Sequence, residues 1–186
     1  MIAPREQPSG FPPLTVSRLA LLAGGRDDAF RELVRDLVDF SARLQRIREE
    51  IARAMGVSSP QYNILMCIAH CNDQNVTVGR VAELLRVSVP FVVTETRRLV
   101  DAGLLIKQSD LQDRRRVYLH LRPQAVAALK DVAPLQRGVN DILFESLGQK
   151  EFAQLQTIIS GLLQSCAPAF AEAEKSSAAR RVSAGV

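Results

Sequence analysis

The chain has 186 residues, a length that suggests one domain or one domain with a helical extension. Hydrophobic residues make up 47%, enough to form a core, and charged residues make up 24%, an ordinary share for a globular protein. No apolar run approaches the roughly 18 residues that cross a bilayer, so we expect no contact with a membrane. An odd, small number of cysteines (Cys67, Cys71 and Cys166) is unlike a disulfide framework. It indicates a reducing compartment, and we expect a cytoplasmic protein.

Both ends of the chain are unlike its middle. Residues 1–14 are rich in proline and also contain Gly10, which is typical of an extended segment. A short helix is predicted over 15–23, closed by Gly24 and Gly25. We therefore treat 1–26 as an arm that is partly disordered or wraps a partner. Residues 173–186 are small, polar and basic, and are predicted to form a flexible tail.

A long helix is predicted next, within 27–58. Asp27 and Asp28 favour its first turn, and Gly56 favours its end. Apolar residues recur at steps of three and four, as in a coiled-coil seam: Phe30, Leu33, Leu37, Phe40, Leu44, Ile47 and Ile51. So long a helix needs a second long helix to cover this stripe. We favour a dimer seam, and a stripe packed within one chain is the alternative.

Three shorter helices follow in close succession. The first begins at Ser59 and Pro60 and ends before a polar turn at 72–75. The second is predicted over 78–85, with Thr77 as its N-cap. After a tight turn, Ser88 caps the third, which carries a proline in its first turn and stops at Gly103.

The pattern then changes from helix to strand. Residues 104–106 are apolar, 110–116 form a charged turn, and apolar and polar residues alternate over 117–122, which predicts a β-hairpin. Two short helices and a tight turn followed by such a hairpin make a winged helix-turn-helix, here over 59–122. Seven basic and three acidic side chains give 97–122 a charge of +4, equal to the net charge of the whole chain. A phosphate backbone would be attracted to this segment.

The last part of the chain is predicted to be helical again. One apolar stripe begins after Pro123, with bends expected at Pro134 and Gly138: Val126, Leu129, Val132, Val139 and Ile142. Beyond Gly148, a second stripe has steps of three and four: Phe152, Leu155, Ile159, Leu162 and Cys166. We interpret 123–172 as dimerisation helices. The expected fold is therefore mainly α with a small β-hairpin, in which long N- and C-terminal helices flank the winged helix-turn-helix.

The helix-turn-helix and the wing together resemble the MarR family of bacterial transcriptional regulators. The matching residues are 77–90, 99–105 and the wing at 110–121, and the likeness in element order extends over roughly 27–170. The resemblance implies a homodimer that binds a palindromic operator in double-stranded DNA. It also implies a repressor that a small, aromatic or acidic effector releases. A winged-helix module for protein–protein contact is the alternative, which the basic wing disfavours.

The resemblance also implies roles for single residues. Arg115 matches a wing arginine that enters the minor groove, Asp113 an acid that orients the wing, and Arg98 a contact to phosphate. Val89, Phe91 and Val93 stand where the family often has polar side chains, and Phe91 either touches thymine methyl groups or belongs to the core. The expected DNA-binding residues are Thr77, Ser88, Val89, Pro90, Phe91, Thr94, Arg97, Arg98, Asp113, Arg114, Arg115 and Arg116.

An effector site is expected in the crevice between the long helices and the DNA-binding lobe. Arginines on the first long helix would suit a carboxylate, although they are also typical of a solvated helix surface. The candidate residues are Phe40, Arg43, Arg46, Tyr62 and His70.

Metal binding and catalysis are both disfavoured. Cys67, His70 and Cys71 have the i, i+3, i+4 spacing of possible metal ligands, but we interpret this spacing as incidental and expect no metal or cofactor. The sequence has no Gly-rich phosphate loop, no metalloprotease motif and no Ser/His/Asp set, and no acid–base partner is evident for His70 or His120. We therefore do not expect an enzyme.

Overall fold

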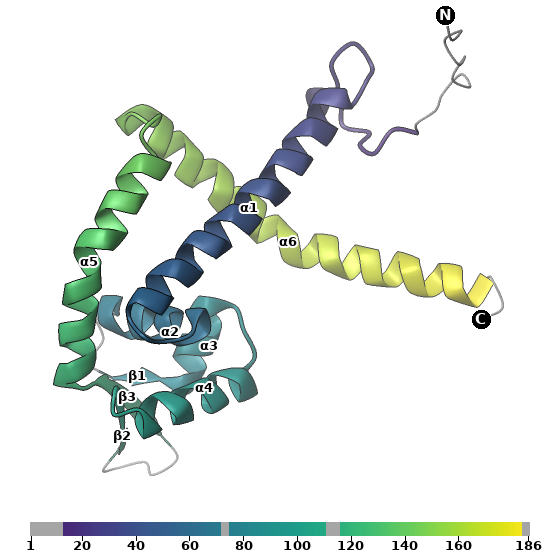
Figure 1. The fold of residues 1–186 in the computed structure, drawn as a ribbon. Helices are drawn as coiled ribbons and strands as arrows, with labels where there is room; N and C mark the ends of the chain where they lie inside the picture. The colour runs from purple at the N-terminus through teal and green to yellow at the C-terminus, as the bar shows by residue number, and fades with distance from the viewer. Residues whose placement is uncertain (1–12, 72–74, 111–115, 184–186) are drawn as a thin grey trace, which may run out of the picture. The chain divides into compact units, whose positions relative to one another are not determined.

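The computed structural model describes residues 13–71, 75–110 and 116–183 and divides into two compact units, 1–133 and 134–186. The described residues are mainly helical with one small sheet, as the sequence predicted (Figure 1). In chain order the elements are η1 (Leu19–Leu21), α1 (Asp28–Ala54), α2 (Ser59–His70), β1 (Val76–Thr77), α3 (Val78–Leu85), α4 (Val89–Asp101), β2 (Leu105–Ser109), β3 (Val117–Leu121), α5 (Pro123–Leu143) and α6 (Gln149–Ser183).

The segment before α1 is held against the start of that helix. The amide and the hydroxyl of Thr15 each donate a 2.6 Å hydrogen bond to the Asp27 carboxylate, and Arg31 donates to its other oxygen at 3.0 Å. The helix expected over 15–23 was predicted too long, because only the three residues of η1 are helical. Gly24 and Gly25 both have positive φ, which allows the tight turn that follows η1.

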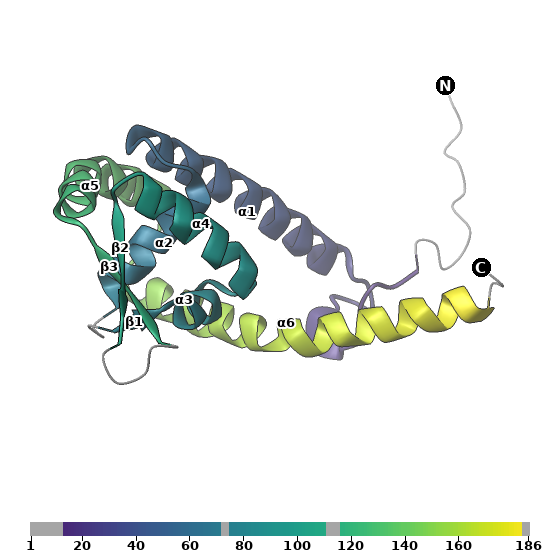
Figure 2. The same ribbon diagram turned by 90° about the horizontal axis from the view of Figure 1, so that it is seen from below.

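Helix α1 has the predicted start and stripe, but the middle of its stripe is exposed. Its last turn contributes Ile51 and Ala52 to a small core with Tyr62 and Val132. Further toward its N-terminus, Leu33, Leu37 and Phe40 are 53%, 40% and 42% exposed. Figures 1 and 2 both show this half of α1 extending away from α2, α3 and α4. Leu33, Leu37 and Phe40 therefore have no cover among the described residues of 13–133.

Local capping interactions set the starts of α2, α3 and α4. Ser58 and Gln61 form a capping box at α2, which begins at Ser59 as predicted. Thr77 accepts a hydrogen bond from the amide of Arg80, and Ser88 accepts one from the amide of Phe91, which confirms both predicted caps.

The wing is part of a three-stranded antiparallel sheet in the order β1-β3-β2. The predicted hairpin pairs β2 with β3, with Leu105 opposite Leu121. Strand β1 was not predicted, since it has two residues and forms only by pairing with β3, where Thr77 lies opposite Tyr118. The sheet therefore ties the start of α3 directly to the wing.

A single apolar core holds the helix-turn-helix on this sheet. Helices α2, α3 and α4 gather beside the strands (Figure 2), and their inward faces supply most of the core, with the remainder from the sheet and the start of α5. The buried residues are Ile64, Leu65, Ile68, Val76, Val81, Ala82, Val92, Leu99, Leu104, Leu105, Leu119 and Ala125.

The two C-terminal helices differ from prediction mainly in length. Helix α5 continues through Pro134, where a bend was expected, and α6 continues as far as Ser183. The tail at 173–186 was predicted to be flexible, but the structure is helical up to Ser183. Alanine, glutamate and arginine, which have high helix propensity, are frequent in this stretch and explain the extension.

Candidate nucleic-acid interface

Helix α4, the second helix of the helix-turn-helix, is buried on one face only. Val92, Thr96 and Leu99 are fully buried in the core. Val89 and Val93, which are one helical turn apart on a different face, are 50% and 46% exposed. The helix therefore presents apolar side chains away from the core in its first two turns.

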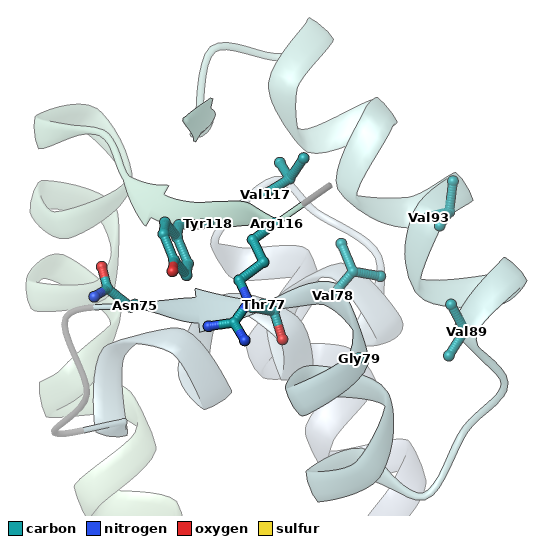
Figure 3. Close-up of a pocket in the computed structure, with 9 residues that line it drawn as sticks. All are labelled: Asn75, Thr77, Val78, Gly79, Val89, Val93, Arg116, Val117 and Tyr118. Carbon is teal, nitrogen blue, oxygen red and sulfur yellow. The ribbon is translucent and has the colours of Figure 1, made fainter. Parts of the chain in front are cut away.

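These two valines form one wall of a groove of about 790 Å³ (Figure 3). The start of α3 and the wing form the other walls, because β1 holds the two together. The remaining lining residues are Asn75, Thr77, Val78, Gly79, Arg116, Val117 and Tyr118. The first turns of two helices and the base of a basic wing thus open onto one groove, with a cation at its rim and apolar side chains along its walls.

The base of the wing is closed by two hydrogen bonds. The amide of Asp110 donates to the carbonyl of Arg116 at 2.9 Å, and the hydroxyl of Tyr118 donates to the Asp110 carboxylate at 2.9 Å. These bonds fix where the chain leaves β2 and re-enters β3. Arg116, at the end of the turn, is exposed and lies at the groove.

Arg97 and Arg98 are neighbours in sequence but lie in different environments. Arg98 is held in a 2.6 Å ion pair with Glu95, which is itself buried and accepts a 3.1 Å hydrogen bond from Gln61 of α2. Arg97 is exposed and forms no hydrogen bond or ion pair among the residues that the structure describes. Arg97 follows Val89 and Val93 at the next helical turn, so it extends the same stripe of α4.

The other predicted DNA-binding residues fall at or near this groove, or outside the described ranges. Thr77 lines it, and Ser88 and Pro90 form the exposed start of α4. Thr94 is exposed, and its hydroxyl donates to the Pro90 carbonyl at 3.1 Å. Phe91 is 39% exposed and does not line the groove. Asp113, Arg114 and Arg115 lie outside the described residues.

Several lining residues were missed by the sequence analysis. Val78 and Gly79 could have been found, because a cap at Thr77 places them in the first turn of α3. Asn75, Val117 and Tyr118 gave no local signal, since only the pairing of β1 with β3 brings them to the groove.

Comparison with protein families identifies this lobe. Residues 57–117 match the model of the MarR family, and this range contains the helix-turn-helix and most of the wing. The winged helix-turn-helix lobe of this chain is therefore a MarR family domain. Members of this family bind DNA through the winged helix-turn-helix, so the groove beside α4 lies in a DNA-binding element. The family consists of regulators and not of enzymes.

Solved MarR structures share the fold over most of the chain. AbsC from Streptomyces coelicolor, a MarR family transcriptional regulator, is 17% identical with a TM-score of 0.68, covering 74% of this chain and 93% of its own. The S. aureus MepR–DNA complex is 16% identical with a TM-score of 0.60, covering 80% and 99%. A cysteine mutant of MarR from E. coli, complexed with operator DNA, is 18% identical with a TM-score of 0.63, covering 79% and 99%. No match was found among curated proteins.

The residues predicted for an effector site are dispersed over α1 and α2. Phe40 and Arg46 lie on the exposed part of α1, and Arg43 forms a 2.8 Å ion pair with Asp39 there. Tyr62 is buried among Ile51, Ala52 and Val132, so it does not face a crevice. Burial raises the pKa of its hydroxyl, which has no hydrogen-bond partner among the described residues.

His70 alone of those five lines a cavity, of about 520 Å³, between α1, α2 and α3. The lining residues are Arg48, Asn63, Met66, Cys67, His70, Cys71, Arg80, Leu84 and Leu85. Arg48 donates a hydrogen bond to Asn63 across the gap between α1 and α2. Two arginines and an imidazole thus surround a partly apolar cavity, a combination suited to an organic anion.

Among the described residues, Cys67 is a weak nucleophile, and neither a metal site nor a membrane-spanning helix is found. Burial and the neighbouring Cys71 raise the pKa of the Cys67 thiol to about 11, so it is protonated and weakly nucleophilic at neutral pH. No group of three or more His, Cys, Asp or Glu side chains in the described ranges is placed to hold a metal. No helix in the part of the chain that the structure describes is long and apolar enough to cross a membrane.

Proposed function

We propose that this regulator is a homodimer that binds a palindromic operator and represses transcription until a small organic anion releases it. The observation that carries the proposal is the groove beside α4, where exposed residues of a recognition helix meet a basic wing. A helix fits the major groove of duplex DNA, and arginine side chains beside it neutralise phosphates. We assign DNA binding to 59–122, with Arg97, Arg116 and the wing arginines as its cationic contacts.

The uncovered stripe of α1 supports the dimer. Leu33, Leu37 and Phe40 are exposed along it, and α6 has apolar side chains that are exposed in the same way. These include Phe152, Leu155, Ile159 and Leu162. Burial of both stripes against a second copy would remove a large apolar surface from water. A two-fold dimer also matches the symmetry of a palindromic operator. We therefore assign dimerisation to 27–58 and 123–172, and leave 1–26 as an arm that contacts the partner.

The cavity between α1, α2 and α3 supports the effector. It joins the proposed dimerisation helix to the first helix of the helix-turn-helix, so a ligand there would favour one spacing of the two DNA-binding lobes over another. We propose Arg48 and His70, which line this cavity, as the groups that would contact such a ligand, in place of the predicted Arg43 and Arg46. Affinity for DNA would fall by at most the ratio of the ligand's affinities for the released and the DNA-binding states.

Selection of bound fragments from a pool of genomic duplex DNA tests the proposal, followed by titration of the selected fragment at two salt concentrations. We expect a palindrome whose half-sites are about ten base pairs apart, bound at nanomolar concentration with a steep dependence on salt. Light scattering of the same sample should give the mass of a dimer. Recovery of no enriched sequence, with weak and salt-sensitive binding only, would refute specific regulation and favour a protein partner for the winged helix.

Addition of small aromatic acids to the complex tests the release step. We expect release by at least one such acid from the wild-type protein, and a much weaker response from Arg48→Ala, while Arg43→Ala should respond as wild type does. A response lost in Arg43→Ala and kept in Arg48→Ala would place the effector on the exposed part of α1 instead.

A further inference from the structure

We propose that Val89 and Val93 read the methyl groups of two thymines in each half-site of the operator. The inference rests on the proposed function, because it assumes that α4 enters the major groove of a specific sequence. It assigns to these two residues a base preference that their position in the groove and their chemistry determine.

Neither valine has a role in the core. The core face of α4 is occupied by Val92, Thr96 and Leu99, all fully buried, whereas Val89 and Val93 are 50% and 46% exposed. Two β-branched apolar side chains in successive turns of a surface helix lower its solubility and its helix propensity. Their presence is explained if a ligand covers them.

The groove around the two valines has the apolar and cationic side chains that suit DNA. Val78 and Val117 add apolar surface on the opposite walls, and Arg116 lies at the same groove (Figure 3). By helical periodicity, Arg97 continues the stripe of the two valines one turn further along α4. An apolar strip bordered by guanidinium groups is complementary to a base edge bordered by phosphates.

Among the base edges in the major groove, that of thymine fits a valine side chain best. A valine side chain neither donates nor accepts a hydrogen bond, so it cannot distinguish most groups in the major groove. The C5 methyl of thymine is the apolar group that a base pair presents there. Cytosine, adenine and guanine would each leave a polar group facing the valine without a partner, which disfavours them.

The spacing of the two valines along α4 determines how far apart the two thymines lie. Residues four apart on a helix are separated by about 6 Å along its axis. Successive base pairs rise about 3.4 Å, so the two valines reach positions one or two base pairs apart. Phe91, whose side chain does not line the groove, is not part of this contact, although the sequence left that possibility open.

Replacement of thymine by uracil tests the inference, since uracil keeps the same pairing edge and lacks only the methyl group. The full-length protein is titrated against its selected operator with one thymine replaced at a time. We expect one or two positions per half-site at which affinity falls about four-fold for each methyl removed. Val93→Ser should make one of these positions insensitive to the replacement, and Val89→Ser the other.

Val38→Ser is the matched control, because Val38 is 66% exposed on α1, is not part of its apolar stripe and does not line the groove. It should keep the full sensitivity to uracil, and all three variants should show the wild-type helical circular dichroism. Specific binding that no uracil replacement weakens, or that the serine variants leave equally sensitive, would overturn the inference alone. Failure to select any sequence would overturn the proposed function and the inference together.

Discussion

The hydroxyl of Tyr118 donates a 2.9 Å hydrogen bond to the carboxylate of Asp110 across the base of the wing. Tyr118 also pairs with Thr77 in the sheet, so this residue joins the wing to the start of α3. The position of the basic turn relative to the groove therefore depends on a few bonds at its base.

Removal of that hydroxyl in Tyr118→Phe should weaken DNA binding more than it weakens folding. A partly buried hydrogen bond contributes about 1 kcal/mol, so we expect a small fall in the free energy of unfolding. The fall in operator affinity should be several-fold, because the wing arginines lose their fixed base. Fluorescence anisotropy and urea denaturation measure the two effects. Equal operator affinity in the variant and the wild type would show that the bond does not position the wing.

Arg97 and Arg98 should differ in their effect on DNA binding. Arg97→Ala removes a cation that has no partner among the described residues, and we expect weaker binding and a slope of log affinity against log salt that is smaller by about one. Arg98→Ala should change this slope less, because Arg98 is paired with Glu95. It should instead lower the free energy of unfolding by about 1 kcal/mol, since Glu95 stays buried with Gln61 as its remaining side-chain partner. The reverse assignment of the two effects would contradict this geometry.

The contact between Thr15 and Asp27 should depend on pH. Hydrogen bonds from the Thr15 hydroxyl and amide, together with Arg31, lower the pKa of the Asp27 carboxyl from 3.8 to about 2. A carboxyl whose pKa is lower when folded stabilises the folded state above its unfolded pKa. This stabilisation is lost as the pH falls toward 2. The attachment of residues 13–26 to α1 should therefore be complete at neutral pH and weaken in acid.

Thr15→Val removes the hydroxyl and keeps the amide, so it should raise the pKa of Asp27 toward its ordinary value. An NMR titration of the carboxyl carbon measures this shift, and hydrogen exchange at the Thr15 amide measures the attachment. An unchanged pKa in the variant would mean that the hydroxyl does not contribute.

Tyr62 provides a test of packing without a polar contribution. Its hydroxyl is buried with no partner among the described residues, so Tyr62→Phe should leave the free energy of unfolding unchanged or raise it by up to about 1 kcal/mol. Tyr62→Ala should lower it by about 3–5 kcal/mol, because it leaves a cavity between α1, α2 and α5. Thermal and urea denaturation measure both. A clear loss of stability in Tyr62→Phe would indicate that the hydroxyl has a partner in the assembled protein.

The elements predicted from sequence were those that local interactions determine. Thr77 and Ser88 cap their helices with their own side chains, and Gly103 ends α4 with positive φ, so each signal lies within a few residues of its effect. The alternation at 117–121 likewise predicted β3 from side-chain pattern alone.

Features that depend on contacts between distant residues could not be predicted in this way. Strand β1 exists because Val76 pairs with Leu119, and two residues are too few to form a sequence pattern that predicts a strand. Tyr62 was assigned to an effector crevice that the family resemblance implied, but it is buried in a core that includes Val132 of α5. The ion pair of Arg98 depends on where Gln61 of α2 holds Glu95. The groove residues on α4 were predicted in part, since the phase of the buried face was decided by packing.

Thr77 belongs to two elements at once, as the last residue of β1 and the cap of α3. A joint of one residue leaves little freedom between the wing and the helix-turn-helix, so they should move as a single body. Control of DNA binding by distortion inside the lobe is then disfavoured. In the proposed dimer, an effector would then act by changing how far apart two such rigid lobes are held, and so would change the half-site spacing that the dimer accepts more than the bases that it reads.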